Sequence, residues 1–256
     1  MNAPDETLLP RLEAQGVCTL PHLGVMAAQG PEAALFLHNQ LTNDFLLLDR
    51  SHARLAAFCN AKGRMQASMV GFKTSDDQVL LVLQKDLLAQ TLKRLSLFVL
   101  RAKVKLSDFT EQQAVWGLSG EVMRAVSDSA LSPWATLELP QGILIGLYPV
   151  GDQARALLLP VGDMPIQSTI DHADWLAGEV LAGVADVQEA TFESFVPQML
   201  NYESVGGVNF KKGCYPGQEV VARSQFRGTL KRRMARVHSS EALQPGQDVF
   251  TPADPE

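Results

Sequence analysis

The chain has 256 residues, of which 46% are hydrophobic and 20% charged, and a formal net charge of −6. This composition is typical of a globular protein with a sizeable core, and the acidic balance argues against general nucleic-acid binding. The three widely spaced cysteines, Cys18, Cys59 and Cys214, favour a reducing compartment and argue against a disulfide framework, a zinc site or an iron–sulfur cluster held by this chain alone.

The first residues, MNAPDETLLPRLEAQG, are polar and acidic. They have neither the apolar core of a secretory signal nor the arginines of a transit peptide. No apolar stretch reaches the ~18–20 residues that a membrane helix needs. We therefore expect a cytoplasmic protein without membrane contact, in which residues 1–20 form a flexible lead-in.

Residues 21–110 predict a first α+β subdomain. Apolar runs bounded by turn residues indicate strands, and leucines spaced by three or four, as at Leu88, Leu92 and Leu95, indicate an amphipathic helix. The expected elements are a strand at 23–28, a helix at 31–41, strands at 54–60, 65–73 and 79–83, a helix at 85–100 and a strand at 104–106.

Residues 111–226 predict a second α+β subdomain, and this region carries the string KGCYPGQE. The expected elements are strands at 114–118, 136–139, 143–148 and 156–159, helices at 121–128, within 166–182 and at 217–226, and a long irregular segment at 183–213. Such a segment inside a compact domain is usually functional. Mixed hairpins and crossovers favour helices on one face of a mostly antiparallel sheet.

The last residues, 227–256, predict a strand at 227–238 followed by a turn at 244–247. We interpret them as the start of a short or truncated C-terminal β-barrel.

Cys214 is the strongest candidate for chemistry. It precedes a predicted helix and follows Lys211 and Lys212, and a helix N-terminus and ammonium groups both favour a thiolate. Gly213 and Gly217 allow close backbone approach, and free N–H groups there can hold an anion. The alternative is that Cys214 is a buried filler beside a tight turn.

The same string carries a family resemblance. Residues 212–219 match KGCYxGQE, the hallmark of the YgfZ family, in order. Three further segments resemble family motifs: FVPQMLN at 195–201, FLHNQLTND at 36–44 and CNAKGR at 59–64. The match runs from about residue 23 to about 247, so it involves nearly the whole chain.

The resemblance implies a fold similar to the glycine cleavage T-protein, in which two ferredoxin-like subdomains and a small β-barrel surround a channel that binds tetrahydrofolate. It makes Cys214 the reactive group, tuned by Lys212 and positioned beside the pterin. Leu23 stands where some members carry a folate-contacting tryptophan. The implied cofactor-binding residues are Trp175, Asn60, Lys62, Arg64, Tyr215, Gln218 and Glu219.

Some of these residues have a plainer interpretation. Trp175 can also be a core or rim aromatic on a helix. Asn60, Lys62 and Arg64 can bind the carboxylates of a folate tail, or belong to an ordinary solvated hairpin.

Two features depart from the T-protein pattern. Ala67 and Ser68 stand where that enzyme has an acidic pair, and Leu181 stands where a glutamate contacts the pterin ring. Without those carboxylates, general acid–base assistance and pterin hydrogen bonds are missing. Whether the chain is an enzyme therefore stays open, and aminomethyl transfer is not expected.

By resemblance, the function is that of a folate-binding accessory protein that supports assembly, maintenance or repair of iron–sulfur enzymes, including tRNA-modifying ones. The expected partners are folate and, transiently, those enzymes. One alternative is a folate-dependent one-carbon transferase. Another is a non-catalytic scaffold that binds an iron–sulfur enzyme or RNA through its basic stretch at 227–236, although such a stretch can also be a solvated edge strand.

Overall fold

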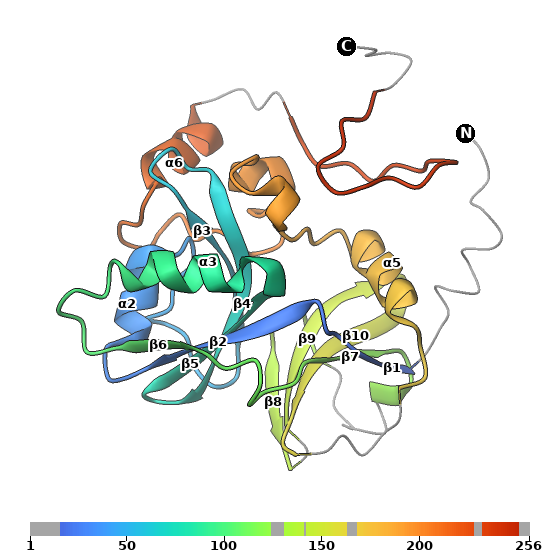
Figure 1. Ribbon diagram of the computed structural model, residues 1–256, viewed down its shortest axis with the longest axis horizontal. Coiled ribbons are helices and arrows are strands. Elements are labelled where there is room, and N and C mark those ends of the chain that lie inside the picture. Colours follow the sequence, from blue (N-terminus) through green and yellow to red (C-terminus); the bar gives the residue numbers. More distant parts are fainter. Residues whose placement is uncertain (1–15, 124–130, 141, 163–167, 228–231, 251–256) are drawn as a thin grey trace.

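The computed structural model describes residues 16–123, 131–140, 142–162, 168–227 and 232–250 (Figure 1). In this part of the chain, two five-stranded antiparallel sheets lie side by side, with helices beside them. The helices are α2 (Ala33–Gln40), α3 (Lys85–Ser96), α5 (His172–Ala182) and α6 (Gln218–Phe226), with short 3₁₀ turns η1 (Glu189–Thr191) and η2 (Pro197–Leu200). The predicted α+β class is confirmed.

The first sheet has the strand order β3-β4-β5-β2-β6. Its strands are β2 (Leu23–Gln29), β3 (Ala53–Cys59), β4 (Met65–Ser75), β5 (Gln78–Gln84) and β6 (Lys105–Asp108). Since successive side chains of a strand point to opposite faces, Met26 and Ala28 pack into one core with α2 and α3. Val25 and Ala27 point to the other face and pack with residues of the second sheet.

The second sheet has the order β1-β7-β10-β9-β8. Its strands are β1 (Gly16–Thr19), β7 (Trp116–Ser119), β8 (Thr136–Leu139), β9 (Gly142–Val150) and β10 (Gln153–Pro160). The prediction of a flexible lead-in up to residue 20 is wrong from residue 16 onward. Val17 and Cys18 are buried, and β1 pairs with β7 across a hundred residues, a contact that local sequence does not reveal.

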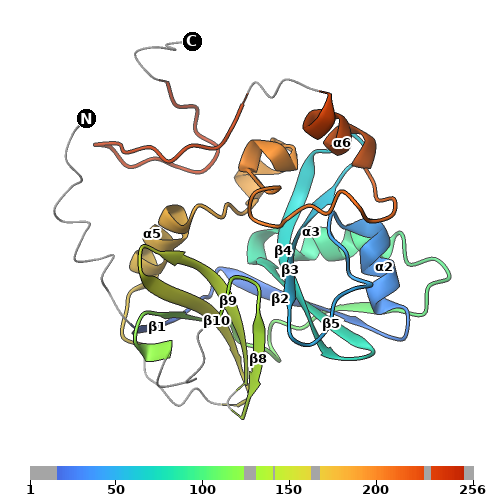
Figure 2. The same ribbon diagram turned by 180° about the vertical axis from the view of Figure 1, so that it is seen from behind.

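The irregular segment after α5 packs against the first sheet. Val187, Leu200 and Val208 join the core of that sheet, and Tyr202 is fully buried with its hydroxyl donating to the Ala185 carbonyl at 2.7 Å. Figure 2 shows the segment and α6 beside β3 and β4. The KGCYPGQE motif, which we assigned to the second subdomain, packs against elements of the first, because Lys212 donates to the carbonyls of His38 and Leu41.

The C-terminal segment 232–250 forms no strand in the described part of the chain and is mostly exposed. It is attached through Met234, whose N–H donates to the Met199 carbonyl at 2.7 Å. The strand predicted at 227–238 is thus absent at 232–238. Most of the helix predicted at 121–128 lies outside the described residues. Among those described, no helix is long and apolar enough to span a membrane.

Candidate functional site

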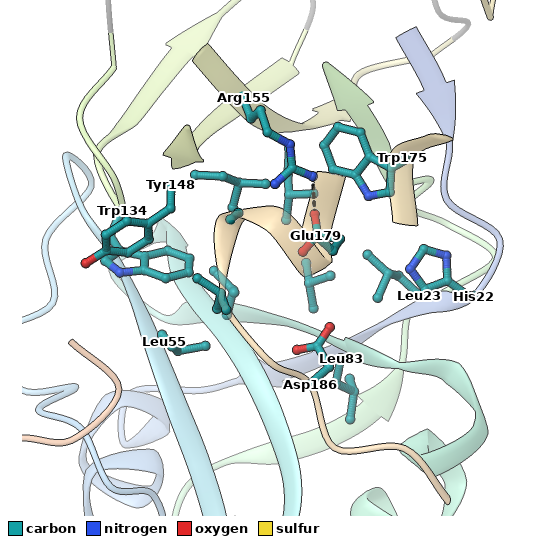
Figure 3. Close-up of a pocket in the computed structure, with 16 residues that line it drawn as sticks. His22, Leu23, Leu55, Leu83, Trp134, Tyr148, Arg155, Trp175, Glu179 and Asp186 are labelled. Atoms are coloured by element: carbon teal, nitrogen blue, oxygen red, sulfur yellow. Dashed lines mark hydrogen bonds and ion pairs between the residues drawn. The ribbon is translucent and has the colours of Figure 1, made fainter. Parts of the chain in front are cut away.

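A narrow cavity of about 50 Å³ lies between the two sheets (Figure 3). Its wall combines side chains from β2 to β5 with side chains from β9, β10 and α5, so neither sheet makes it alone. A wider cavity of about 570 Å³ adjoins it and shares His22, Glu179, Val184 and Asp186 with it. The wider cavity continues past Leu181 and reaches the C-terminal segment at 234–236. We call the two together the inter-sheet cavity.

Arg155 connects two other side chains in the wall of the inter-sheet cavity, Glu179 and Trp175. It extends from β10, is 3% exposed, and donates from Nη2 to Glu179 Oε1 on α5. Its guanidinium carbon lies 4.2 Å from the ring centroid of Trp175, a cation–π contact. Gly117 also packs against this indole, since a Cβ there would lie 2.5 Å from the ring. Trp175 thus reaches the cavity wall as expected, but Arg155 already covers its ring.

Asp186 supplies a second carboxylate. Its Oδ1 accepts from the Ser68 hydroxyl at 3.2 Å and its Oδ2 from Gln84 Nε2 at 3.1 Å. The carboxylate is accessible from the cavity, yet the surrounding protein raises its pKa to about 6, with help from the charge of Glu179. Figure 3 shows the carboxylates of Glu179 and Asp186 both projecting into the middle of the cavity.

These two carboxylates correct an expectation from sequence. We expected the site to lack acidic groups because Ala67, Ser68 and Leu181 replace them. Instead Asp186, 118 residues from Ser68, places a carboxylate beside that serine. Glu179, which precedes Leu181 on α5, places a second carboxylate on the cavity wall. The Ser68 hydroxyl also accepts from the Val187 N–H at 2.8 Å, which holds the segment in place.

His22 lines one side of the cavity and is in contact with a second histidine. His172 Nε2 lies 2.6 Å from His22 Nδ1, and the rings are tilted with centroids 4.5 Å apart. Burial, reinforced by His172, lowers the pKa of His22 to about 4, so this imidazole is neutral at neutral pH. No positive charge from His22 therefore offsets the two carboxylates.

The KGCYPGQE turn lies elsewhere. Cys214 is exposed, and it is absent from the walls of the inter-sheet cavity. Lys212 is buried, and its ammonium donates to the carbonyls of His38 and Leu41, the latter at 2.9 Å. Burial lowers the Lys212 pKa to about 8, and the ammonium lies 4.7 Å from the Tyr215 ring centroid. Lys212 therefore fastens the turn to the end of α2.

The β3–β4 turn is the partner of this motif. Asn60 Oδ1 accepts the N–H groups of Lys62 at 2.9 Å and Arg64 at 3.0 Å. Gly217, with φ of 81°, packs so closely that a Cβ would lie 2.4 Å from the Asn60 carbonyl oxygen and 2.7 Å from the Gly63 Cα. The structure therefore brings the motif and this turn together and keeps both away from Trp175.

The remaining predicted residues continue the same unit. Gln218 and Glu219 open α6, and Glu219 forms an exposed ion pair with Arg223 at 2.7 Å. The Tyr215 ring is buried, which raises the pKa of its hydroxyl. None of these three lines the inter-sheet cavity.

A third cavity of about 440 Å³ lies next to the motif and is lined by Arg54, Phe210 and Lys211. Leu55 and Trp134 contribute to both this cavity and the inter-sheet one. Across the described residues, no group of three or more His, Cys, Asp or Glu side chains is arranged to hold a metal ion.

Comparison with known proteins decides the family. No family model matches the chain. An uncharacterized protein of Haemophilus influenzae is 30% identical over 234 residues, with 90% of this chain and 77% of the relative covered. The tRNA-modifying protein YgfZ of Cronobacter sakazakii is 30% identical over 244 residues, with 86% and 70% covered. The chain belongs to the YgfZ family.

The fold comparison agrees with this assignment. The glycine cleavage system aminomethyltransferase T of Bartonella henselae superposes with a TM-score of 0.66 at 15% identity, over 87% of this chain and 66% of that one. At that identity the likeness establishes a shared fold, and the YgfZ-family chain spans about two thirds of the enzyme's length. The T-protein-like fold expected from the motifs is confirmed.

Sequence reasoning missed four residues of the cavity: His22, Arg155, Glu179 and Asp186. Each is an ordinary charged or polar residue outside any motif, and each meets its partner through the packing of two sheets. No local signal in the sequence points to them.

Proposed function

We propose that this chain is a cytoplasmic folate-binding accessory protein that supports assembly, maintenance or repair of iron–sulfur enzymes, including tRNA-modifying ones. The observation that carries the folate part is the inter-sheet cavity with the carboxylates of Glu179 and Asp186 inside it. The tRNA part is supported by family membership, since the Cronobacter relative is a tRNA-modifying protein.

The residues present fit a folate. The 2-amino-4-oxopyrimidine edge of a pterin carries N–H donors, and Asp186 and Glu179 offer acceptors. The wide part of the cavity, about 570 Å³, falls within the ~300–1,000 Å³ of small-molecule sites, whereas the narrow part, about 50 Å³, holds only a small group. Arg236 also lines the wide part and can pair with a tail carboxylate. A bound reduced folate supplies one-carbon carrier chemistry.

Cys214 has a different task in this proposal. Because its thiol is exposed on a turn fixed by Lys212 and Gly217, a partner protein can reach it without passing through the cavity. We assign Cys214 the role of a nucleophile that reacts with the transient iron–sulfur partner protein. Folate binding and thiol chemistry then occupy two separate surfaces of one protein.

A titration of tetrahydrofolate into the full chain tests the folate part. Trp134 and Trp175 line the cavity, so their fluorescence reports binding. Asp186→Asn loses a charged acceptor, which is worth ~1.5–3 kcal/mol, so its affinity should fall about tenfold or more. The exposed Asp76→Asn is the control. Absence of any folate binding by the wild type would refute the proposal.

Complementation tests the thiol part. In a bacterium that lacks its own YgfZ protein, the chain should restore modification of tRNA by an iron–sulfur enzyme, and Cys214→Ser should not. Tetrahydrofolate binding by Cys214→Ser should match the wild type, since the thiol lies outside the cavity. Full complementation by the serine variant would remove the thiol from the mechanism.

Folate-dependent one-carbon transfer is a second candidate because of Asp186. A carboxyl group with a pKa of about 6 inside a ligand-sized cavity is suited to general acid–base catalysis near neutral pH. Turnover of an aminomethyl or methylamine donor with tetrahydrofolate, abolished by Asp186→Asn, would establish it. Folate binding without turnover would exclude the transferase and support the accessory function.

A further inference from the structure

A buried histidine lies directly beneath the KGCYPGQE turn. His38 is on the last turn of α2 and is 7% exposed. Its Nδ1 lies 3.1 Å from Asp44 Oδ1. That oxygen also accepts the N–H groups of Leu46 at 2.9 Å and Leu47 at 3.1 Å, so the carboxylate is held in place. Those contacts and the charge of His38 keep the Asp44 pKa low even though burial opposes this.

The opposite edge of the imidazole faces the motif. A Cβ built on Gly213 would lie 3.4 Å from His38 Nε2, so this nitrogen is the ring atom that faces the glycine. Lys212, the residue before it, donates its ammonium to the His38 carbonyl oxygen. The residue after it is Cys214, whose side chain is exposed. Lys212 therefore contacts the His38 backbone, Gly213 lies beside the Nε2 side of the ring, and the next residue carries the thiol.

The orientation of the ring defines its chemistry. A neutral imidazole that donates Nδ1–H to a carboxylate keeps its lone pair on Nε2. In His38 that lone pair points toward the motif backbone. The only hydrogen bond that the imidazole makes among the described residues goes through Nδ1 to Asp44, so Nε2 is available to accept a proton. This arrangement of carboxylate, histidine and nearby nucleophile is the general pattern of an activated thiol.

We propose that His38, oriented by Asp44, is the base that accepts the proton of Cys214. The inference rests on the reactive role proposed above for that thiol. The proton leaves Sγ and binds Nε2, directly after rotation of the thiol or through one water, and Asp44 stabilises the resulting imidazolium. The thiolate then attacks an electrophile. With iodoacetamide, the S–C bond forms, the C–I bond breaks and iodide leaves.

Other charged groups around the ring bear on the pH dependence. Asp44 contacts the ring from the loop after α2, and from the motif the Lys212 ammonium donates to the His38 carbonyl oxygen and lies 4.7 Å from the Tyr215 ring centroid. The Lys212 ammonium also stabilises a thiolate, but burial lowers the Lys212 pKa to about 8, so this contribution fades above that pH. The Tyr215 hydroxyl stays protonated in the working range because burial raises its pKa.

Alkylation of the native full chain by iodoacetamide tests the proposal. Cys18 and Cys59 are buried, so the rate reports Cys214. His38→Gln keeps a donor for Asp44 but removes the base, and the rate at pH 7 should fall about tenfold or more, with the pH midpoint of the reaction moving upward. The matched control is His52→Gln, because His52 Nδ1 also lies 3.1 Å from a carboxylate, Asp49, but on the exposed surface.

Equal alkylation rates and pH midpoints for His38→Gln and the wild type would overturn the proposal. If His38→Gln does not fold, NMR titration of the His38 ring in the wild type and in Cys214→Ser gives the answer, because coupling between two titrating groups is reciprocal. Removal of the thiol should shift the imidazole titration, and an unchanged titration would also overturn it. Complementation by Cys214→Ser, tested separately, reports on the proposed function and not on this pair.

Discussion

The two regions of interest in this molecule are built in opposite ways. The KGCYPGQE turn is one short stretch of chain, and it packs onto another short stretch at the β3–β4 turn. The inter-sheet cavity has no sequence motif, and its charged side chains come from β10, α5, the segment after α5 and the C-terminal segment. The turn is held by close backbone packing and by the Lys212 ammonium, whereas the cavity side chains are held by an ion pair and hydrogen bonds with one another.

The structure separates two features that the family resemblance places together, namely the Cys214 thiol and the cavity expected to hold the pterin. We expected the thiol and the pterin to meet in one channel. The structure gives the thiol an exposed position and gives the cavity its own acid–base groups. Substitutions in one region should therefore leave the other region's readout intact, and each prediction below uses that independence.

The largest effect is expected for Gly217→Ala. The residue has φ of 81°, and an added Cβ would lie 2.4 Å from the Asn60 carbonyl oxygen and 2.7 Å from the Gly63 Cα. Left-handed strain costs ~1–2 kcal/mol, and overlap with two backbone atoms adds more, so the free energy of unfolding should fall by about 4 kcal/mol. Urea unfolding measures it, and the iodoacetamide reactivity of Cys214 should change as the turn opens.

A matched glycine isolates the packing contribution. Gly151 has φ of 55° and nothing within 4 Å of an added Cβ, so Gly151→Ala should lose only the ~1–2 kcal/mol of left-handed strain. Tetrahydrofolate affinity of folded Gly217→Ala should remain that of the wild type. Equal losses for the two alanine variants would contradict the close approach between the motif and the β3–β4 turn.

Arg155→Met should have the next largest effect, this time on the cavity. Removing one member of a buried ion pair leaves the other charge uncompensated and costs ~3–5 kcal/mol. Glu179 keeps partial access to water, with its side chain 27% exposed, so we expect about 3 kcal/mol. The Trp175 ring also loses its cover, so its fluorescence should shift, while Cys214 alkylation stays unchanged.

The surface pair Arg223–Glu219 provides the contrast for that substitution. Its side chains are 66% and 83% exposed, and exposed pairs contribute ~0–1 kcal/mol. Arg223→Met should therefore leave the urea midpoint almost unchanged. A loss of stability as large as that of Arg155→Met would mean that burial does not explain the stabilising effect of the Arg155–Glu179 ion pair.

Much of the fold was predictable because its signals are local. Apolar runs bounded by turn residues predicted β2, β3, β4 and β5, and leucine spacing predicted α3, each within a few residues of its observed bounds except at the C-terminal end of α3. β1 was not predictable, since four residues carry too little pattern and the strand exists because β7 lies beside it. The helix predicted at 85–100 ends at Ser96, four residues early, because Leu97 begins a turn.

The candidate site also has one part that the sequence predicts and one part that it does not. The motif turn was recognisable because its glycines and lysines are consecutive. Asp186 was not recognisable, because its place in the cavity depends on hydrogen bonds from Ser68 and Gln84, which lie far away in the sequence. His38 was likewise assigned no role from sequence, since its contacts with Asp44 and Gly213 depend on how α2 meets the motif.

The smallest predicted effect concerns the pH dependence of stability, and it arises from Asp186. Its pKa is raised from 3.8 to about 6 in the folded protein, so the folded state binds more protons than the unfolded state between these values. Stability should therefore fall as pH rises from about 4 to about 6. Two pH units at ~1.4 kcal/mol each give an upper bound near 3 kcal/mol, and access to water in the cavity reduces this to about 1 kcal/mol.

Urea unfolding of the wild type and Asp186→Asn at several pH values between 4 and 7 measures this contribution. The difference between the two proteins should change by about 1 kcal/mol across that range, with the asparagine variant gaining relative stability at the higher pH. Asp76→Asn, on the surface, should track the wild type throughout. If the difference in free energy of unfolding between the wild type and Asp186→Asn stayed constant with pH, the pKa of the cavity carboxylate would not be raised. The cavity would then have no carboxyl group suited to acid–base chemistry near neutral pH.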